Sequence, residues 1–219
     1  MAEQRRAKPS RPDRRTTNTR ARILQHAEQL YYSGGYVGIS LQQLAADLGL
    51  TKPALFHHFR SKQDLFFAML LEMLEQRRAR IEDAIATASG TEERLRAILH
   101  TMAACPFFDP MKFLTDERGK LRPEQQREIE VAFAHAVQEP IGRVLAEGVE
   151  RSELRPHPPA LGVMVFLNLM MLLPAPGHPN PRLAASVASD PSTYIEELLA
   201  FFTRGIGSTG RPQAQEGSS

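Results

Sequence analysis

Cysteine and tryptophan are nearly absent: the 219 residues include one cysteine, Cys105, and no tryptophan. A single thiol excludes a disulfide framework and any cluster of thiolate metal ligands within this chain. We therefore expect a reducing compartment, the cytoplasm, and no metal or other cofactor. Cys105 stands beside Pro106 and Phe107, and we interpret it as a small buried hydrophobe in preference to a redox sensor.

Long apolar runs are also missing. The longest candidate, residues 161–173, is shorter than the roughly 18 residues that cross a bilayer, and it contains Asn168. The first 15 residues carry charge where a signal peptide has an apolar segment. We expect no membrane partner, and the content of 42% apolar and 24% charged residues is typical of a globular protein.

Charge is distributed unevenly along the chain. Residues 1–63 contain 11 Lys or Arg against 4 Asp or Glu, whereas residues 64–219 contain 16 against 21. A basic part attached to an acidic part suggests that the first meets a polyanion. Charge alone leaves a solvated basic tail as an open alternative.

The apolar spacing predicts an all-α chain, because no segment alternates as a strand does. Residues 1–19 are rich in Arg, Pro, Ser and Thr, so we expect a flexible basic arm, and residues 207–219 have the composition of a disordered tail. A first helix is predicted from Arg20 to Gly34-Gly35. Later helices are predicted over residues 40–48, 51–59, 61–89, 91–104, 123–152, 157–173 and 191–205.

Three of the predicted helices open with capping residues. Ser40, with Gln43 three residues later, predicts a capping box, and Thr51 is the expected cap of the next helix. Ser61 with Asp64 repeats the signature before the long helix. At about 1.5 Å per residue that helix is roughly 40 Å long. It is too long for the basic part alone, so we expect it to join the two parts.

The segment 41–59, LQQLAADLGLTKPALFHHF, has the spacing of a helix-turn-helix. Two helices that cross through a short turn need a small residue at their contact and a Gly that can adopt positive φ. Ala45 and Gly49 meet these needs. Apolar residues that would lock the pair are Leu44, Leu48, Leu50 and Leu55. An ordinary helical hairpin remains the alternative for these residues taken alone.

The second helix of this motif would enter the major groove of DNA by its amino-terminal part. Lys52 can donate to guanine O6 and N7, the small pair Pro53 and Ala54 can touch a thymine methyl, and His57 can reach a base edge or the groove wall. Phosphate contacts are expected from the cap residues and from the far rim of the helix. The predicted DNA-binding residues are Ser40, Thr51, Lys52, Pro53, Ala54, His57, His58 and Lys62.

Three apolar residues of the same helix, Leu55, Phe56 and Phe59, are expected to pack inward. His57 and His58 are adjacent, which directs their rings to different faces of a helix, so they do not predict a metal pair.

Over residues 20–71 the chain resembles the TetR family of bacterial transcriptional regulators. The resemblance is carried by TRARILQHAEQLYYSGGY, by LQQLAADLGLTKPALFHHFRSKQDLF, and above all by Leu55-Phe56-His57-His58-Phe59 followed by Ser61-Lys62. It covers about a quarter of the chain. Phe56 stands where the family often has Tyr or Ile, and Pro53 where relatives often have Gly.

The prediction is therefore an all-α protein with an N-terminal three-helix helix-turn-helix DNA-binding domain and a C-terminal helical-bundle ligand-binding and dimerisation domain. Its expected divisions are a basic arm (1–19), a DNA-binding domain (20–60), a regulatory and dimerisation domain (61–206) and a tail (207–219). The resemblance implies a homodimeric repressor that a small molecule releases from a palindromic double-stranded operator. The two last helical segments are the expected dimer surface, although both being buried within one monomer remains an alternative.

An effector would occupy the second domain. We expect it to be uncharged or weakly anionic and largely apolar, because no acidic residue flanked by aromatics appears between residues 91 and 173. The candidate lining, which could equally be filled core, is His100, Met102, Phe107, Phe108, Phe113, Phe133, His135, Met164, Asn168 and Met171.

Two other functions stay open on the sequence. One is an activator or an effector-independent regulator of the same fold, and the other is a helical enzyme or interaction module. No Ser-His-Asp order, phosphate-binding Gly loop or HExxH motif occurs, so an enzyme is not expected.

Overall fold

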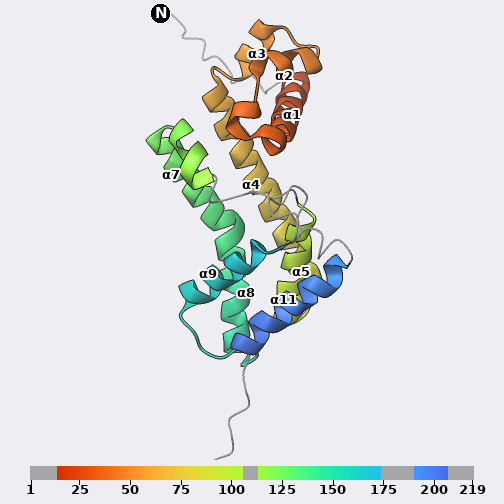
Figure 1. The fold of residues 1–219 in the computed structure, drawn as a ribbon, viewed down its shortest axis with the longest axis vertical. Coiled ribbons are helices and arrows are strands. Elements are labelled where there is room, and N and C mark those ends of the chain that lie inside the picture. Colours follow the sequence, from red (N-terminus) through yellow and green to blue (C-terminus); the bar gives the residue numbers. More distant parts are fainter. Residues whose placement is uncertain (1–13, 106–112, 174–189, 207–219) are drawn as a thin grey trace, which may run out of the picture. The chain divides into compact units, whose positions relative to one another are not determined.

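The computed structural model describes residues 14–105, 113–173 and 190–206 (Figure 1). Within these ranges every regular element is helical and no β-strand occurs, which confirms the predicted fold class. The chain forms two compact units that divide between Leu70 and Leu71. The sequence placed this boundary after residue 60.

The amino-terminal unit begins with α1, Arg14–Gly38. Its apolar stripe was predicted from three-and-four spacing, and Ile23, Leu24 and Ala27 are indeed buried. The helical geometry breaks at Gly35, which has φ 63° and ψ −160°, as the Gly pair predicted.

The expected flexible arm is wrong for residues 14–19, which are helical. No Gly or Pro lies between residues 14 and 33. Once the apolar stripe anchors the helix, each added residue gains one hydrogen bond for one pair of dihedral angles, so the helix extends toward the amino terminus. Residues 1–13 of the expected arm lie outside the described residues.

Two short helices follow, α2 (Leu41–Asp47) and α3 (Lys52–His58), and then the long α4 (Lys62–Thr87). The first turns of α4 complete the core of the amino-terminal unit. The Phe66 ring lies 5.6 Å from the Tyr31 ring and 4.9 Å from the Tyr36 ring, centroid to centroid. This packing is the reason that the unit extends past the predicted boundary.

The carboxyl-terminal unit contains the rest of α4 and the later helices. These are α5 (Thr91–Ala103), a π-helical turn η1 (Phe113–Glu117), a 3-10 turn η2 (Arg118–Lys120), α7 (Pro123–Phe133), η3 (Ala134–Gln138), α8 (Glu139–Glu150), α9 (Pro159–Met170) and α11 (Pro191–Ile206). Helix α5 contacts both α8 and α11, and α8 contacts α9. The core between them includes Leu95, Ile98, Val144, Phe166 and Phe202.

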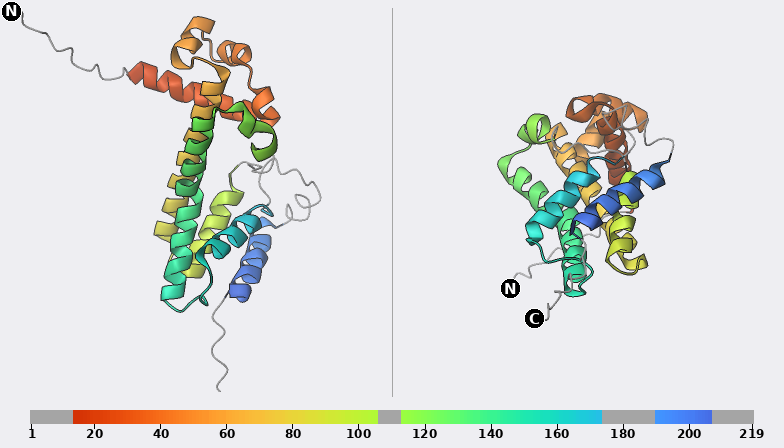
Figure 2. Two further views of the ribbon diagram at one scale, coloured as in Figure 1. Left: turned by 90° about the vertical axis from the view of Figure 1, so that its left-hand side faces the viewer. Right: turned by 60° about the horizontal axis from the view of Figure 1, so that its bottom comes forward.

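The predicted helix over residues 123–152 appears as one continuous rod made of α7, η3 and α8 (Figure 2). Its central turn η3 is π-helical, and the Glu139 N–H donates to the Ala134 carbonyl five residues back. Pro140 follows directly, lacks an N–H and has a ring that crowds the preceding turn, so the hydrogen-bond ladder shifts there. None of the described helices has the length and apolar character needed to cross a bilayer.

Candidate nucleic-acid interface

Helices α2 and α3 form the predicted helix-turn-helix (Figure 1). Gly49 in the turn has φ +64°, as the motif requires, and the Leu50 N–H donates to the Ala45 carbonyl at 2.8 Å. Leu44 and Leu55 are fully buried between the helices and their neighbours. The pair is therefore held by apolar contacts and by a turn that favours glycine.

The two caps predicted within this motif are present. The Ser40 hydroxyl accepts from the Gln43 N–H at 3.3 Å, and the Thr51 hydroxyl accepts from the Ala54 N–H at 3.3 Å. The predicted capping box at Ser40 is only half formed, because the Gln43 side-chain amide donates to Asp47 Oδ1 at 2.6 Å instead of turning back. Phosphate contacts by Ser40 and Thr51 remain predictions.

One face of α3 points outward. The exposed residues of this face are Lys52, Pro53, Phe56 and His57. They form two i, i+4 pairs, Lys52 with Phe56 and Pro53 with His57, and this spacing aligns side chains along one side of a helix. Ala54 and His58 are half-buried. The structure thus brings most of the predicted DNA-binding residues together on a single short helix.

The expected inward packing is confirmed for Leu55 and Phe59 and is wrong for Phe56, which is 37% exposed. Each helical residue advances by about 100°, so the residue after the buried Leu55 turns away from the core. The Phe56 ring lies instead beside Lys52, whose Nζ is 6.0 Å from the ring centroid.

His58 lies at the carboxyl end of α3 beside a residue that the motif did not identify. The Arg20 guanidinium of α1 is 5.3 Å from the centroid of the Phe59 ring. Burial lowers the pKa of His58, and the nearby His57 and Arg20 lower it further. No carboxylate among the described residues is within ion-pair distance of Arg20 or His58. Arg20 therefore adds positive charge to this rim, and only the packing of α1 against α3 reveals it.

Lys62 has a structural role at the start of α4. Its Nζ donates to the Val37 carbonyl at 3.3 Å and lies 4.5 Å from the centroid of the Tyr36 ring. Burial lowers the pKa of Lys62. The side chain thus ties α4 to the end of α1, and its contact with phosphate remains a prediction.

A second tie that the sequence did not suggest joins α1 to α2. His26 Nε2 lies 2.8 Å from Asp47 Oδ2, and Gln43 occupies the other carboxylate oxygen. The hydrogen bond from His26, and then that from Gln43, lowers the pKa of Asp47. Because α2 packs against α3, the pair of His26 and Asp47 helps to orient the outward face of α3.

The candidate effector residues that the structure describes lie in different surroundings. Phe107 and Phe108 lie outside the described residues. Phe113 is buried, and Met102 and Phe133 pack against the core. The expected character of Cys105 is confirmed: it is buried, and its thiol donates to the Thr101 carbonyl at 3.3 Å.

The polar and methionine candidates lie mostly at the surface. His135 Nδ1 is 2.8 Å from Glu139, and His100 Nε2 is 3.9 Å from Glu196. Met164 is 56% exposed, Met171 is half-buried, and the exposed Asn168 amide donates to the Met164 carbonyl. Helix α9 is apolar nearly all round, so spacing alone could not indicate which face is buried.

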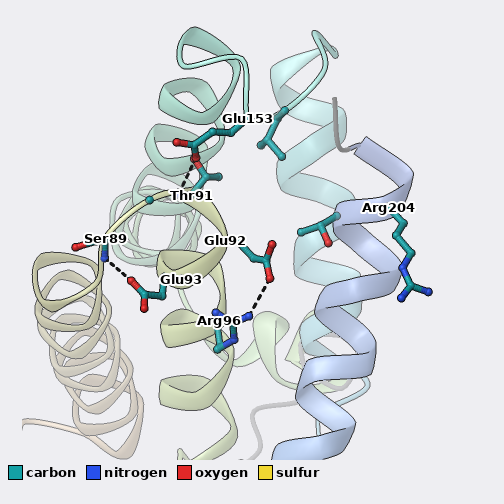
Figure 3. A pocket seen from close by; sticks show the side chains of 10 residues that line it. Ser89, Thr91, Glu92, Glu93, Arg96, Glu153 and Arg204 are labelled. Carbon is teal, nitrogen blue, oxygen red and sulfur yellow. Dashed lines mark hydrogen bonds and ion pairs between the residues drawn. The ribbon is translucent and has the colours of Figure 1, made fainter. Parts of the chain in front are cut away.

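A groove of about 610 Å³ lies elsewhere in this unit (Figure 3). None of the ten candidate effector residues lines it. Its polar groups bond largely to one another: the Thr91 N–H donates to Glu153 at 2.9 Å, the Ser89 N–H to Glu93 at 2.9 Å, and Arg96 to Glu92 at 2.9 Å.

The expected dimer helices carry apolar side chains on two faces. Phe166 of α9 and Phe202 of α11 are buried with ring centroids 5.2 Å apart. On α11 Phe201 is 78% exposed. The exposed apolar residues of α9 and the turn after it are Leu161, Met164, Val165 and Leu172. Burial of both segments within one monomer, the alternative left open above, therefore accounts for only part of their apolar surface.

Two short helices joined by a positive-φ glycine turn, with a cationic and apolar outward face on the second, form a helix-turn-helix, the motif of a large class of DNA-binding proteins. The sequence profile of bacterial regulatory proteins of the tetR family matches residues 23–69, which span this motif and its supporting helices. Over this region the chain is similar to the TetR family of transcriptional regulators.

Individual relatives are distant. The transcriptional activator FasR of Mycolicibacterium smegmatis is 29% identical over 41% of this chain and 39% of its own length. The transcriptional repressor AcnR of Corynebacterium glutamicum is 26% identical over 71% of this chain and 79% of its own. The solved structure of AibR with isovaleryl coenzyme A and operator DNA is 23% identical, has a TM-score of 0.56, and matches 69% of this chain and 83% of AibR. The last likeness concerns the fold.

Proposed function

We propose that the chain is a sequence-specific transcriptional regulator that binds a palindromic DNA operator as a homodimer. The observation that carries this proposal is the outward face of α3, where Lys52 and His57 are exposed beside apolar groups. In the major groove, base edges offer hydrogen-bond acceptors to cationic donors and the thymine methyl to apolar side chains. We place this function in the cytoplasm.

The proposal of a dimer rests on the apolar surface of α9 and α11. A single helix-turn-helix reads only a few base pairs, so two copies related by a two-fold axis would read half-sites about 34 Å apart or somewhat more. A second copy that covers Phe201, Leu161 and Val165 would remove from water the largest exposed apolar side chains of these helices. The sequence match to regulators supports the same arrangement.

We further propose that the protein represses transcription and is released by a small, largely apolar effector held in the carboxyl-terminal unit. AcnR is a repressor and FasR an activator, so activation is the alternative within the family. AibR has been solved with an acyl coenzyme A and operator DNA, which supports an apolar acyl group as a first effector class to test. Release requires that the effector bind more tightly to the conformation that fits DNA poorly. We propose no enzymatic activity.

The test is selection of duplexes from a random pool by the full chain, followed by salt titration and transcription in vitro. We expect an enriched palindrome, affinity that falls steeply with salt, and lower transcription from a promoter that contains the palindrome. Recovery of no preferred duplex would favour the interaction-module alternative. Higher transcription would establish the activator.

A further inference from the structure

Helix α2 is too short to fix its own direction. It has seven residues, of which Leu44 and Ala45 are buried. Isolated helices of this length are not stable in water, so contacts with other helices determine how α2 lies. Apolar contacts have no preferred direction, whereas a hydrogen bond requires a defined distance and angle. A polar contact between α2 and α1 is therefore well suited to set the direction of α2.

Such a contact joins His26 of α1 to Asp47, the last residue of α2. His26 Nε2 lies 2.8 Å from Asp47 Oδ2, and the two side chains are 27% and 30% exposed. Gln43, one turn earlier on α2, donates to Asp47 Oδ1 at 2.6 Å. An ionised carboxylate only accepts hydrogen bonds, so His26 is the donor. The carboxylate is thus held between one donor on its own helix and one on α1.

A carboxylate at this position is unfavourable for α2 taken alone. The carboxyl-terminal end of a helix has partial negative charge, which repels an acidic side chain. Asp also has a lower helix propensity than Ala. The partners of Asp47, and not the stability of α2 itself, explain why an acidic residue suits this position.

The turn that follows Asp47 transmits its position to α3. The Leu50 N–H donates to the Ala45 carbonyl at 2.8 Å, so the turn is bonded back onto α2. Helix α3 begins at Lys52, five residues after Asp47. A change in how α2 lies on α1 would therefore change the direction of α3.

We propose that His26 and Asp47 are positioning residues for DNA recognition. Their hydrogen bond fixes the angle at which α2 presents α3, and it thereby determines how well the chain distinguishes its operator from other DNA. This inference rests on the proposed DNA-binding function. It concerns selectivity, because base contacts depend on the placement of α3, whereas attraction to phosphates depends mainly on charge.

The experiment measures this selectivity. Once a preferred duplex has been selected with the full chain, affinity is measured for that duplex and for a scrambled duplex of the same length and composition. The ratio of the two affinities should fall about 5-fold or more in His26→Leu, which corresponds to the loss of one weak base contact. Affinity for the scrambled duplex and its salt dependence should keep their wild-type values, because the Lys and Arg side chains are unchanged.

Further variants separate positioning from stability. His26→Gln keeps an N–H donor, so it should retain most of the wild-type ratio. Asp47→Ala puts a better helix former at the end of α2 but removes the acceptor, so the ratio should fall while circular dichroism and thermal unfolding show a folded protein. The double variant His26→Leu/Asp47→Ala should lose no more than either single variant, because both remove the same hydrogen bond.

Gln29→Leu is the matched control, because Gln29 is exposed on α1 three residues after His26. It should keep the wild-type ratio. Gln43→Ala removes only the donor to Asp47 Oδ1, so it should lower the ratio less than His26→Leu does. This milder change tests the inference in a variant that leaves α1 intact.

Four results would overturn the inference. In the first, His26→Leu and Asp47→Ala keep the wild-type ratio. In the second, these variants lose affinity for both duplexes by the same factor, which would assign the pair to stability alone. In the third, His26→Gln loses as much selectivity as His26→Leu. In the fourth, the double variant loses the product of the two single losses, so the residues act independently. Failure to select any duplex would instead remove the proposed function, and this inference with it.

Discussion

Helix α8 contains two glycines for which the structure predicts opposite effects of the same substitution. A Cβ on Gly148 would lie 2.7 Å from both Cγ2 and Oγ1 of Thr91 and 2.9 Å from Cδ1 of Leu154. Both neighbours are buried, and the Thr91 N–H is bonded to Glu153. Neither can move away cheaply. A Cβ on Gly142 would meet only Val163 Cγ2, at the ordinary distance of 3.5 Å.

The magnitudes follow from two terms. Replacing Gly by Ala inside a helix stabilises by about 1 kcal/mol, and overpacking a buried contact costs about 1–3 kcal/mol. Gly142→Ala should therefore stabilise the carboxyl-terminal unit by up to about 1 kcal/mol. Gly148→Ala should be neutral or destabilising by up to about 2 kcal/mol, which leaves a gap of about 1–3 kcal/mol between the variants.

The assay is urea unfolding followed by circular dichroism, combined with hydrogen exchange of peptides from α5 and α8. Exchange reports the local stability of these helices and separates it from that of the amino-terminal unit. We expect faster exchange at the start of α5 in Gly148→Ala only. If Gly148→Ala proves as stable as Gly142→Ala, the close approach of α5 to α8 is not a constraint and the reasoning fails.

Three further predictions concern DNA binding and assembly. Lys52→Ala or His57→Ala should each weaken specific binding by about 1–3 kcal/mol with helicity unchanged, and wild-type affinity in both would remove them from the interface. Burial first, and then nearby positive charge, lowers the pKa of His58 in the free protein, and a phosphate would raise it. Binding of DNA should then take up a proton, so the affinity for DNA should rise as pH falls from about 8 to 6. This pH dependence should flatten in His58→Gln. An equal pH dependence in the wild type and in His58→Gln would exclude a contact between His58 and phosphate. Phe201→Glu should shift the chain from dimer to monomer in light scattering, while Glu197→Ala on the same helix should not; a dimeric Phe201→Glu would place the interface elsewhere.

The sequence by itself determined the helices and the motif. Apolar spacing located the long helices because a 3.6-residue period requires no knowledge of the partner surface. Ser40, Thr51 and Gly49 located the two short helices and their turn, because a side-chain cap and a positive-φ glycine act within a few residues of themselves. These local signals also carry the resemblance to the TetR family.

Tertiary structure alone decided the surroundings of residues whose spacing left their burial open. Phe56 and Met164 were assigned to a core and a cavity by their apolar character, yet both are exposed. Arg20 reaches the rim of α3 only because α1 packs there, 38 positions from His58 along the chain. Hydrophobicity indicates how much free energy is gained when a residue is buried. Contacts between distant segments determine whether that burial occurs and which charges become neighbours.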